Sequence, residues 1–212
     1  MKFFPSLLAA SIALGVSGGT IAAKSDKKDV DASIYSSIKL RNMGPAVTGG
    51  RVSDFAFNPA NPAEYFVATA AGGMWKTNNA GVTWQAVADS MPSYSYGDVT
   101  MDPNDTNVIW AGTGENNSQR SVAYGDGVYK SVDGGKSWKN VGLKNSEHIG
   151  EILIDPRNSD VVYVASQGPL WSSGGDRGLF KTTDGGKTWN NVLEISKHTG
   201  VSDIAFDPQN PD

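Results

Sequence analysis

The 212-residue chain contains no cysteine and only two histidines. The lack of cysteine excludes a disulfide framework, a thiolate metal site, a cysteine nucleophile and a bacterial lipoprotein anchor. Two histidines leave too few imidazoles for a histidine-built metal centre. Basic residues number 18 against 22 acidic ones, and the net charge of −4 argues against nucleic acid or an anionic membrane as a partner held by bulk charge. We therefore expect no metal, no cofactor and no nucleic-acid partner.

Long apolar runs are also scarce, and the single one, at residues 3–16, is too short to span a membrane. It follows a basic start and precedes a stretch of small residues, in which residues 20–22 form a cleavage signal. This order is typical of a secretory signal peptide. The sequence predicts a signal peptide over residues 1–22, a polar linker over residues 23–38, and a secreted or periplasmic protein without a membrane span.

Glycine, in contrast, is abundant at 25 of 212 residues, and it accompanies six Trp, seven Tyr and seven Phe. Three segments of the chain align, each beginning with Lys and ending with Trp, at residues 76–84, 130–138 and 181–189. Their tryptophans are 54 and 51 residues apart, which is the signature of a repeat. A second column of Asn-Pro or Asp-Pro pairs marks a turn in each unit, at residues 58–59, 102–103, 155–156 and 207–208.

Each unit divides into four strands. The first alternates apolar and polar residues, as at Phe55 and Phe57 or at Val99 and Met101. The second is short and apolar, and the third ends in the shared Lys. A glycine-rich hairpin then leads into a fourth strand that opens with Trp. Repeated four-stranded units of about fifty residues predict an all-β fold, a β-propeller of four-stranded antiparallel blades.

The propeller is expected to be incomplete in this chain. Residues 39–212 hold three blades and the start of a fourth, whereas propellers close with about four to eight blades. An open stack would leave apolar blade faces and strand edges exposed. We therefore expect a fragment of a longer protein, whose remaining blades are partners of the ones present.

The hairpin residues have a defined physical role. An Asx side chain accepts backbone N–H bonds in its own turn, glycine adopts positive φ at little cost, and Trp covers the hairpin. This structural set comprises Asn79, Gly81, Trp84, Asp133, Gly135, Trp138, Asp184, Gly186 and Trp189. The pattern Ser/Thr-x-Asp-x-Gly-x-Thr/Ser-Trp resembles the Asp box, or bacterial neuraminidase repeat. The resemblance implies the N-terminal part of a secreted bacterial protein similar to sortilin-type receptor domains, xyloglucanase-type glycoside hydrolases and photosystem II assembly factors.

Alternate connections of an antiparallel blade lie at opposite ends. The Asx-Pro turns and Asp boxes share one end, and the loops between strands two and three share the other end with the blade-to-blade loops. The long insertions, at residues 112–127 and 167–178, fall at this second end, which is the default binding face of a rigid scaffold. We expect a polypeptide or glycan to be bound there by Arg51, Glu115, Asn117, Gln119, Arg120, Tyr124, Trp171, Asp176 and Arg177. Solvated loop charges that pair with one another are the alternative.

An acidic residue also recurs, four positions before each Asx-Pro pair, at Asp54, Asp98, Glu151 and Asp203. One carboxylate per blade near the start of the innermost strand predicts either a site for a cation or sugar hydroxyls, or hydrogen bonds to the neighbouring blade or loop. Recurrence in every unit favours the second interpretation. The two histidines, at positions 148 and 198, share one repeat column as well, which favours packing over metal binding or general-base catalysis.

No complete catalytic constellation is present in the chain. Glycosidases need two carboxyl groups that flank the bond, and Glu115, in a glycine-rich inserted loop, is a weak single candidate without an assigned partner. By resemblance, xyloglucanases carry a catalytic Asp before a Gly-Gly pair in the first blade, where residues 69–73 of this chain have alanine instead. Sialidase-type chemistry fits no better, because Arg51 lies in Gly-Arg-Val and not in the usual Arg-Ile-Pro start.

We therefore expect a sortilin-like binding module. Two alternatives are a glycoside hydrolase-like enzyme, with its acid pair completed by residues outside this fragment, and a structural or assembly module.

Overall fold

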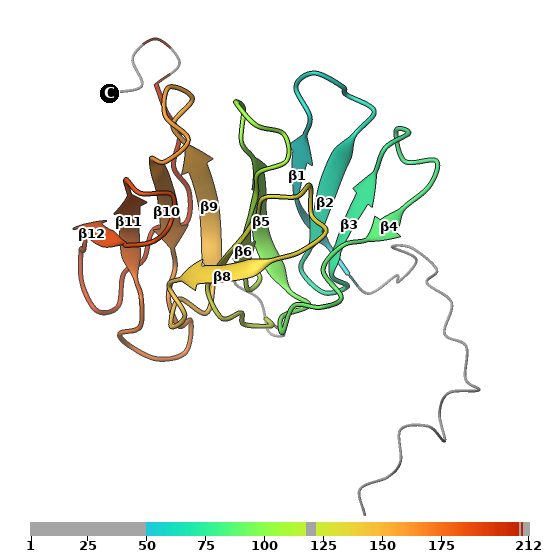
Figure 1. Cartoon of the computed structure of the whole chain (residues 1–212). Coiled ribbons are helices and arrows are strands. Elements are labelled where there is room, and N and C mark those ends of the chain that lie inside the picture. The colour runs from blue at the N-terminus through green and yellow to red at the C-terminus, as the bar shows by residue number, and fades with distance from the viewer. Residues whose placement is uncertain (1–49, 118–121, 208, 210–212) are drawn as a thin grey trace, which may run out of the picture. The chain divides into compact units, whose positions relative to one another are not determined.

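A computed structural model describes residues 50–117, 122–207 and 209. In these residues there is no helix, and twelve strands form three separate four-stranded antiparallel sheets (Figure 1). Each sheet uses four consecutive strands, so each is one propeller blade. The all-β fold and the four-stranded repeat are confirmed. The predicted signal peptide and linker, and two predicted ligand-binding residues, Gln119 and Arg120, lie outside the described residues.

The three blades have the same strand order. The first consists of β1 (Val52–Phe57), β2 (Tyr65–Thr69), β3 (Met74–Thr77) and β4 (Gln85–Ala86). The second consists of β5 (Tyr96–Met101), β6 (Ile109–Thr113), β7 (Val128–Ser131) and β8 (Lys139–Gly142). The third consists of β9 (Ile149–Ile154), β10 (Val162–Ser166), β11 (Gly178–Thr182) and β12 (Asn190–Leu193).

The first strands of the blades lie beside one another, since β1 contacts β5 and β5 contacts β9. Pairing of each first strand with its second strand shifts register immediately before the acidic residue, as between Val52 and Asp54 in β1 and between Tyr96 and Asp98 in β5. At Gly97, in the second of these shifts, a Cβ atom would collide with the carbonyl oxygen of Ile149 on β9. The bulged position therefore lets neighbouring inner strands approach closely.

Two apolar clusters fill the spaces between blades. Blade one and blade two share a cluster that includes Phe66, Met74 and Val99, while blade two and blade three share one that includes Trp110 and Ile152. Among the described residues, no blade packs against the face of blade one that points away from blade two. Its alternating residues are correspondingly exposed, Phe55 to 47% and Phe57 to 56%.

The expected start of a fourth blade, near Ile204 and Phe206, is not a strand in the structure. A strand needs a hydrogen-bonded neighbour, and none of the described strands pairs with this segment. The segment nonetheless packs on blade three, because the ring of Phe206 lies edge-on to Tyr163 with 5.8 Å between ring centroids.

The Asp boxes are closed by their own side chains. In blade two the carboxylate of Asp133 accepts hydrogen bonds from the backbone N–H groups of Lys136 and Ser137, both at 2.9 Å, and from the Ser131 and Ser137 hydroxyls at 2.8 and 2.6 Å. The hydrogen bonds from Ser137 and Ser131 hold the pKa of Asp133 well below its ordinary value.

The blade-one and blade-three boxes use the same geometry. Asp184 in blade three has the same set of contacts as Asp133. In blade one Asn79 replaces the acid and bonds Thr83 through both its amide oxygen and its amide nitrogen, at 2.8 and 2.9 Å. An amide is therefore sufficient to form the turn.

The boxes of blades two and three also join their blades to the preceding ones, which was not expected from the hairpin alone. The indole N–H of Trp138 donates to the carbonyl oxygen of Val87 in blade one at 2.7 Å, and that of Trp189 donates to Val141 in blade two at 2.8 Å. Gly135, the second glycine of the blade-two box, also packs against blade one. A Cβ at this position would lie 2.7 Å from the ring of Phe66.

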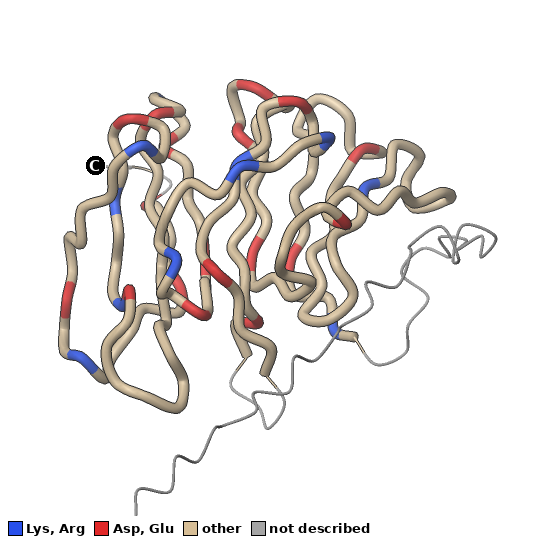
Figure 2. The backbone as a smooth tube through the Cα atoms, turned by 60° about the horizontal axis from the view of Figure 1, so that its bottom comes forward, with Lys and Arg blue, Asp and Glu red and all other residues tan. Residues whose placement is uncertain are grey.

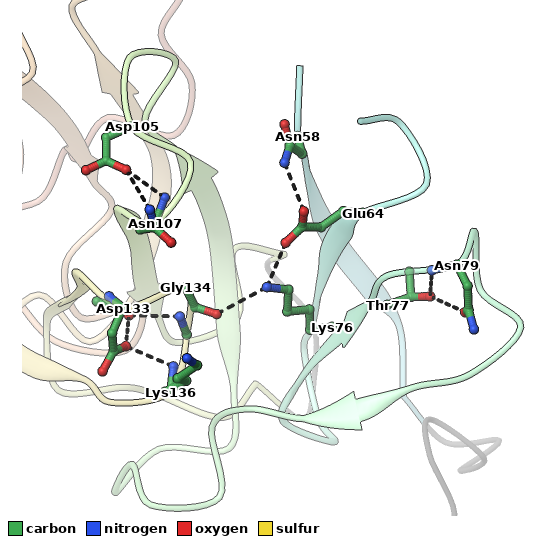
Figure 3. A network of polar contacts seen from close by, with 12 residues as sticks. Asn58, Glu64, Lys76, Thr77, Asn79, Asp105, Asn107, Asp133, Gly134 and Lys136 are labelled. Carbon is green, nitrogen blue, oxygen red and sulfur yellow. Dashed lines mark hydrogen bonds and ion pairs between the residues drawn. The ribbon is translucent and has the colours of Figure 1, made fainter. Parts of the chain in front are cut away.

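A lysine on each third strand completes this joint. Lys76, Lys130 and Lys181 lie over the aromatic rings of their own second strands, with their ammonium groups 5.1, 4.6 and 4.8 Å from the ring centroids. Lys76 also donates to the carbonyl oxygen of Gly134, in the box of the next blade, at 3.4 Å (Figure 3). Each aromatic ring is thus enclosed by a lysine of its own blade and, in the first two blades, by the box of the next.

We predict that Trp138→Phe lowers the free energy of unfolding by about 2 kcal/mol, because the Val87 carbonyl loses its donor and the smaller ring leaves a gap between the blades. Trp84→Phe is the matched control. Trp84 makes no hydrogen bond within the described ranges and contacts Tyr65 of its own blade, so it should cost about 1 kcal/mol or less. Urea unfolding followed by far-UV circular dichroism measures both. Equal losses of stability in the two variants would contradict the role of Trp138 in joining blades one and two.

Candidate ligand-binding face

The Asp boxes and Asx-Pro turns occupy the same end of the blades, as expected. The backbone N–H of Gly134 donates to the carbonyl of Asn107 at 2.9 Å, and that of Gly185 donates to Asp160 at 3.0 Å. Figure 3 shows the first of these turns, with Asp105 and Asn107, above the Asp133 box. The loops between second and third strands consequently lie at the opposite end, which we call the loop face.

A polar cavity of about 650 Å³ opens on the loop face between blades two and three. It is formed by the inserted loops of both blades and by the connection from blade two to blade three, and its lining includes Tyr124, Lys144, Asn145, Glu147, Pro169 and Asp176. Charges of both signs therefore meet around one opening. The loop of blade one, which is much shorter, takes no part in it.

Exposed aromatic rings stand on the loops of this face. The side chain of Tyr124, at the cavity, is 72% exposed, and Trp171, on the loop that supplies Pro169 and Asp176, is 79% exposed. Tyr94, on the connection from blade one to blade two, is 63% exposed. Tyr and Trp side chains combine a large apolar face with a polar group, so each of these exposed rings is able to stack on a ligand.

Arg177 fixes the loop that carries Trp171. Its side chain is 8% exposed, and its guanidinium donates to the carbonyl oxygens of Gln167 at 2.6 Å, Ser172 at 3.2 Å and Gly174 at 3.3 Å, and to that of Pro169. Every one of these acceptors is main chain of the loop itself or of its stem. Arg177 therefore organises the predicted face from beneath, and its donors are occupied by the protein.

Asp176 also connects two elements of the face. One of its carboxylate oxygens accepts the backbone N–H of Asn145, at 2.9 Å, across the cavity from blade three to the preceding connection. Asn117, by contrast, is exposed. Of the predicted ligand-binding residues, Tyr124, Trp171, Asp176 and Arg177 thus fall on the two loops that line one cavity.

Glu115 and Arg51, the other charged residues of the predicted set, form a separate pair nearer the inner strands. Glu115 is 1% exposed and pairs with the guanidinium of Arg51 from blade one. Its own carbonyl oxygen lies 2.8 Å from Nδ1 of His148. Because a carbonyl only accepts, Nδ1 carries the proton, and burial lowers the pKa of His148, so the ring is neutral.

These contacts make the Glu115 loop a link between three blades. Arg51 belongs to the start of blade one, Glu115 to blade two, and His148 to the start of blade three. The other predicted histidine, His198, is exposed. The structure therefore buries the one catalytic candidate in a cross-blade ion pair and does not present it on the open cavity.

The column of acids lies along the inner strands. Asp54 accepts the backbone N–H of Val99, on the next blade, at 3.0 Å, which is the kind of cross-blade hydrogen bond that recurrence predicted. Asp98 is 1% exposed, and burial raises its pKa well above the ordinary value, with the charges of Asp54 and Glu151 adding to the effect. Burial likewise raises the pKa of Asp54, and it raises the pKa of Glu151 to about 7.

Sequence reasoning did not single out Lys144, Asn145 and Pro169 at the cavity. Their only signal was position, since they follow β8 or lie within the inserted loop of blade three. Within the described ranges no three His, Cys, Asp or Glu side chains are grouped so that they could hold a metal ion. No helix in the described part of the chain has the length and apolarity needed to cross a membrane.

Comparison with known proteins agrees with this architecture. The sortilin-Vps10 family (sortilin, neurotensin receptor 3) matches residues 126–212. Among curated proteins, a xyloglucanase of Hypocrea jecorina is 27% identical over 76% of this chain, and one of Paenibacillus sp is 27% identical over 91%. The chain spans only about a fifth of the length of these relatives, 20% and 19% respectively.

Solved structures show the same fold. The GH74 enzyme of Niastella koreensis superposes with a TM-score of 0.56 at 20% identity, over 75% of this chain and 25% of its own. An ancestral GH74 enzyme gives 0.52 at 22% identity, over 69% of this chain and 19% of its own. The predicted resemblance is confirmed: the chain has the fold of a β-propeller segment and is similar to the sortilin-Vps10 family over residues 126–212 and to xyloglucanases over most of its length.

We predict that Arg51 and Glu115 are energetically coupled. In a double-mutant cycle of Arg51→Met and Glu115→Gln, each single change leaves a partner without its counter-charge. The loss of unfolding free energy in the double variant should therefore be smaller than the sum of the two single losses by about 1–2 kcal/mol. The coupling is at the lower end of buried pairs because the Arg51 side chain is 40% exposed. Unfolding in urea measures the cycle, and simple additivity would show that the pair contributes nothing.

We also predict that stability falls as the pH rises between about pH 5 and pH 8. Folding raises the pKa values of Asp98 and Glu151, so the folded chain binds more protons than the unfolded one in this range. Asp98→Asn, which mimics the protonated acid, should raise the free energy of unfolding at pH 8 and flatten the pH profile. The exposed Glu194→Gln is the control and should leave the profile unchanged. A steeper profile for Asp98→Asn would contradict the assignment.

Proposed function

We propose that this chain is the propeller segment of an exported protein that binds a neutral polysaccharide on the loop face. The observation that carries the proposal is the pair of exposed rings, Tyr124 and Trp171, on the two loops that line the 650 Å³ cavity. Pyranose rings present flat apolar faces to aromatic side chains and hydroxyl groups to nearby polar ones, so a solvated ring beside a polar opening suits them.

The blade-three loop that carries Trp171 is prepared for binding because the protein's own contacts already fix it. Arg177 donates to four loop or stem carbonyls, and Asp176 bridges to Asn145. A ring fixed in this way loses little conformational entropy when a ligand stacks on it. Mixed charges around the cavity, from Lys144, Glu147 and Asp176, supply hydrogen-bond donors and acceptors for hydroxyl groups without a net preference for an ionic ligand.

The relatives support a glycan over a polypeptide as the ligand. The curated proteins are xyloglucanases, whereas the match to the sortilin-Vps10 family covers residues 126–212 and names receptors. The relatives also supply the reason to retain a second candidate function, a glycoside hydrolase-like activity of the longer protein. Loss of polysaccharide turnover by a folded Glu115→Gln variant of that longer protein would favour the enzyme over the binding module.

Trp171→Ala and Tyr124→Ala should each weaken binding of xyloglucan oligosaccharides to the full chain about tenfold, since truncation of a stacking ring removes about 1–2 kcal/mol of binding free energy. The matched control is Val82→Ala, an exposed apolar residue of the Asp-box end, which should leave affinity unchanged. Isothermal titration calorimetry measures all three.

Two outcomes would overturn the proposal. Unchanged affinity in both ring variants would place the ligand elsewhere on the propeller. Binding of peptides, but of no oligosaccharide, on a combined glycan and peptide array would replace the glycan by a polypeptide.

A further inference from the structure

A second cavity opens at the opposite end of the same pair of blades. It has a volume of about 590 Å³ and lies between the outer strand of blade two, β8, and the Asp box of blade three. Its lining includes three lysines, one tryptophan and two neutral polar residues: Lys130, Lys139, Lys187, Trp138, Ser137 and Asn140. We call this cavity the lysine groove. No acidic residue lines it.

The lysines of the groove carry no ion pair in the described part of the chain. The three ion pairs found there involve Arg51, Lys76 and Arg157. Lys130 is held in place by the Trp110 ring and by a 3.2 Å hydrogen bond to the carbonyl of Gly185. Asp102 and Asp160 act on Lys130 only from a distance, and burial lowers the pKa of its ammonium group. The local positive charge is therefore incompletely compensated.

The equivalent position between blades one and two provides an internal comparison. There Lys76 corresponds to Lys130, but it forms an ion pair with Glu64 at 2.7 Å, in addition to its contact with Gly134 (Figure 3). The repeat places Val108 where blade one has Glu64, and Lys139 where blade one has Gln85. The same joint is thus neutralised in one copy and left cationic in the next.

The charge of the groove is local and does not follow from a basic surface. The chain has a net charge of −4, and acidic and basic positions are interspersed along the backbone (Figure 2). An anion drawn to this place is therefore attracted by the groove lysines against the charge of the whole chain. Such binding should weaken with added salt, because Lys139 and Lys187 are exposed.

Trp138 indicates which kind of anion fits. Trp138 lines the groove and is half-buried, and its N–H is fixed on the carbonyl of Val87, so its position is rigid. The hydroxyl of Ser137 donates to the carboxylate of Asp133. The side chain of Asn140 donates to the carbonyl of Asp126 and accepts the backbone N–H of Gly142. A flat ring surrounded by ammonium groups suits a sugar ring that bears carboxylate or sulfate groups.

We propose that the lysine groove is a binding site for an acidic oligosaccharide, with Trp138 stacking on a pyranose ring and Lys130, Lys139 and Lys187 contacting its carboxylate or sulfate groups. The site is separate from the loop face, because it lies at the Asp-box end of the blades. It extends the glycan contacts of the chain to a second, anionic class of saccharide.

The test uses the full chain with oligogalacturonate as the carboxylated probe and a heparin-derived hexasaccharide as the sulfated probe. Lys139→Glu together with Lys187→Glu should weaken binding of at least one probe about tenfold or more. Lys136→Glu together with Lys197→Glu changes the net charge equally at exposed positions that line neither cavity, and it should change affinity less than twofold. Far-UV circular dichroism of both variants verifies that the blades remain folded.

The outcomes distinguish a carboxylated from a sulfated ligand, and they include the results that would overturn the site. Tighter binding of one probe identifies carboxylate or sulfate as the preferred group. Equal weakening by both double variants would show bulk electrostatics and overturn the site, as would binding of neither probe at low salt. Binding of polyglutamate with the affinity of the saccharides would show that Trp138 recognises no sugar ring. Neutral xyloglucan should be unaffected by the groove variant, so the loop-face proposal is judged independently.

Discussion

The interaction on which the rest of the structure depends is the hydrogen bond from a box tryptophan to the preceding blade. A four-stranded blade cannot bury both of its faces alone, so its stability comes from neighbours. The indole of Trp138 satisfies the carbonyl of Val87 while its ring joins the apolar cluster of blade one, and Trp189 repeats this on blade two. The same tryptophan thus fixes the orientation of the two blades through its N–H hydrogen bond and buries apolar surface through its ring. The box turn, with its internally bonded Asx side chain, sets the position from which the indole reaches across.

The inner strands show the opposite balance. Close approach there requires bulges and glycine, and it brings Asp54, Asp98 and Glu151 together in a region where burial disfavours their charges. The hydrogen bond from Val99 to Asp54 compensates only part of that cost. The contacts between blades are therefore strong near the boxes, whereas those along the inner strands depend on the protonation of these acids. The Arg51–Glu115 pair adds a third link at the loop end.

Much of the fold was predictable because the determinants are local and repeated. The box residues, the Asx-Pro turns and the alternation at Val99 and Met101 each report on a few neighbouring positions, and repetition multiplies the signal. What lay beyond prediction was long-range. Nothing in the sequence indicates that Arg177 donates to the carbonyls of its own loop, or that Glu115 pairs with Arg51, 64 residues away. Loop burial depends on the path of the main chain, which composition does not determine. The predicted set therefore contained the exposed rings of the loop face together with arginines and a glutamate that serve the scaffold.

The two cavities described above, of about 650 and 590 Å³, both lie between blades two and three for a structural reason. The joint packs Trp189 edge-on against Trp110, with 6.2 Å between ring centroids, and the two cavities are formed beside it by loops and turns. At the loop end, two inserted loops meet and enclose a polar cavity; between blades one and two, the short loop of blade one instead bonds directly to Tyr94 through Gly72 and Gly73. At the box end, Val108 stands where blade one has Glu64, and Lys130 consequently has no counterpart of the Lys76–Glu64 ion pair. Divergence between copies of one module is therefore what distinguishes one interface from the next.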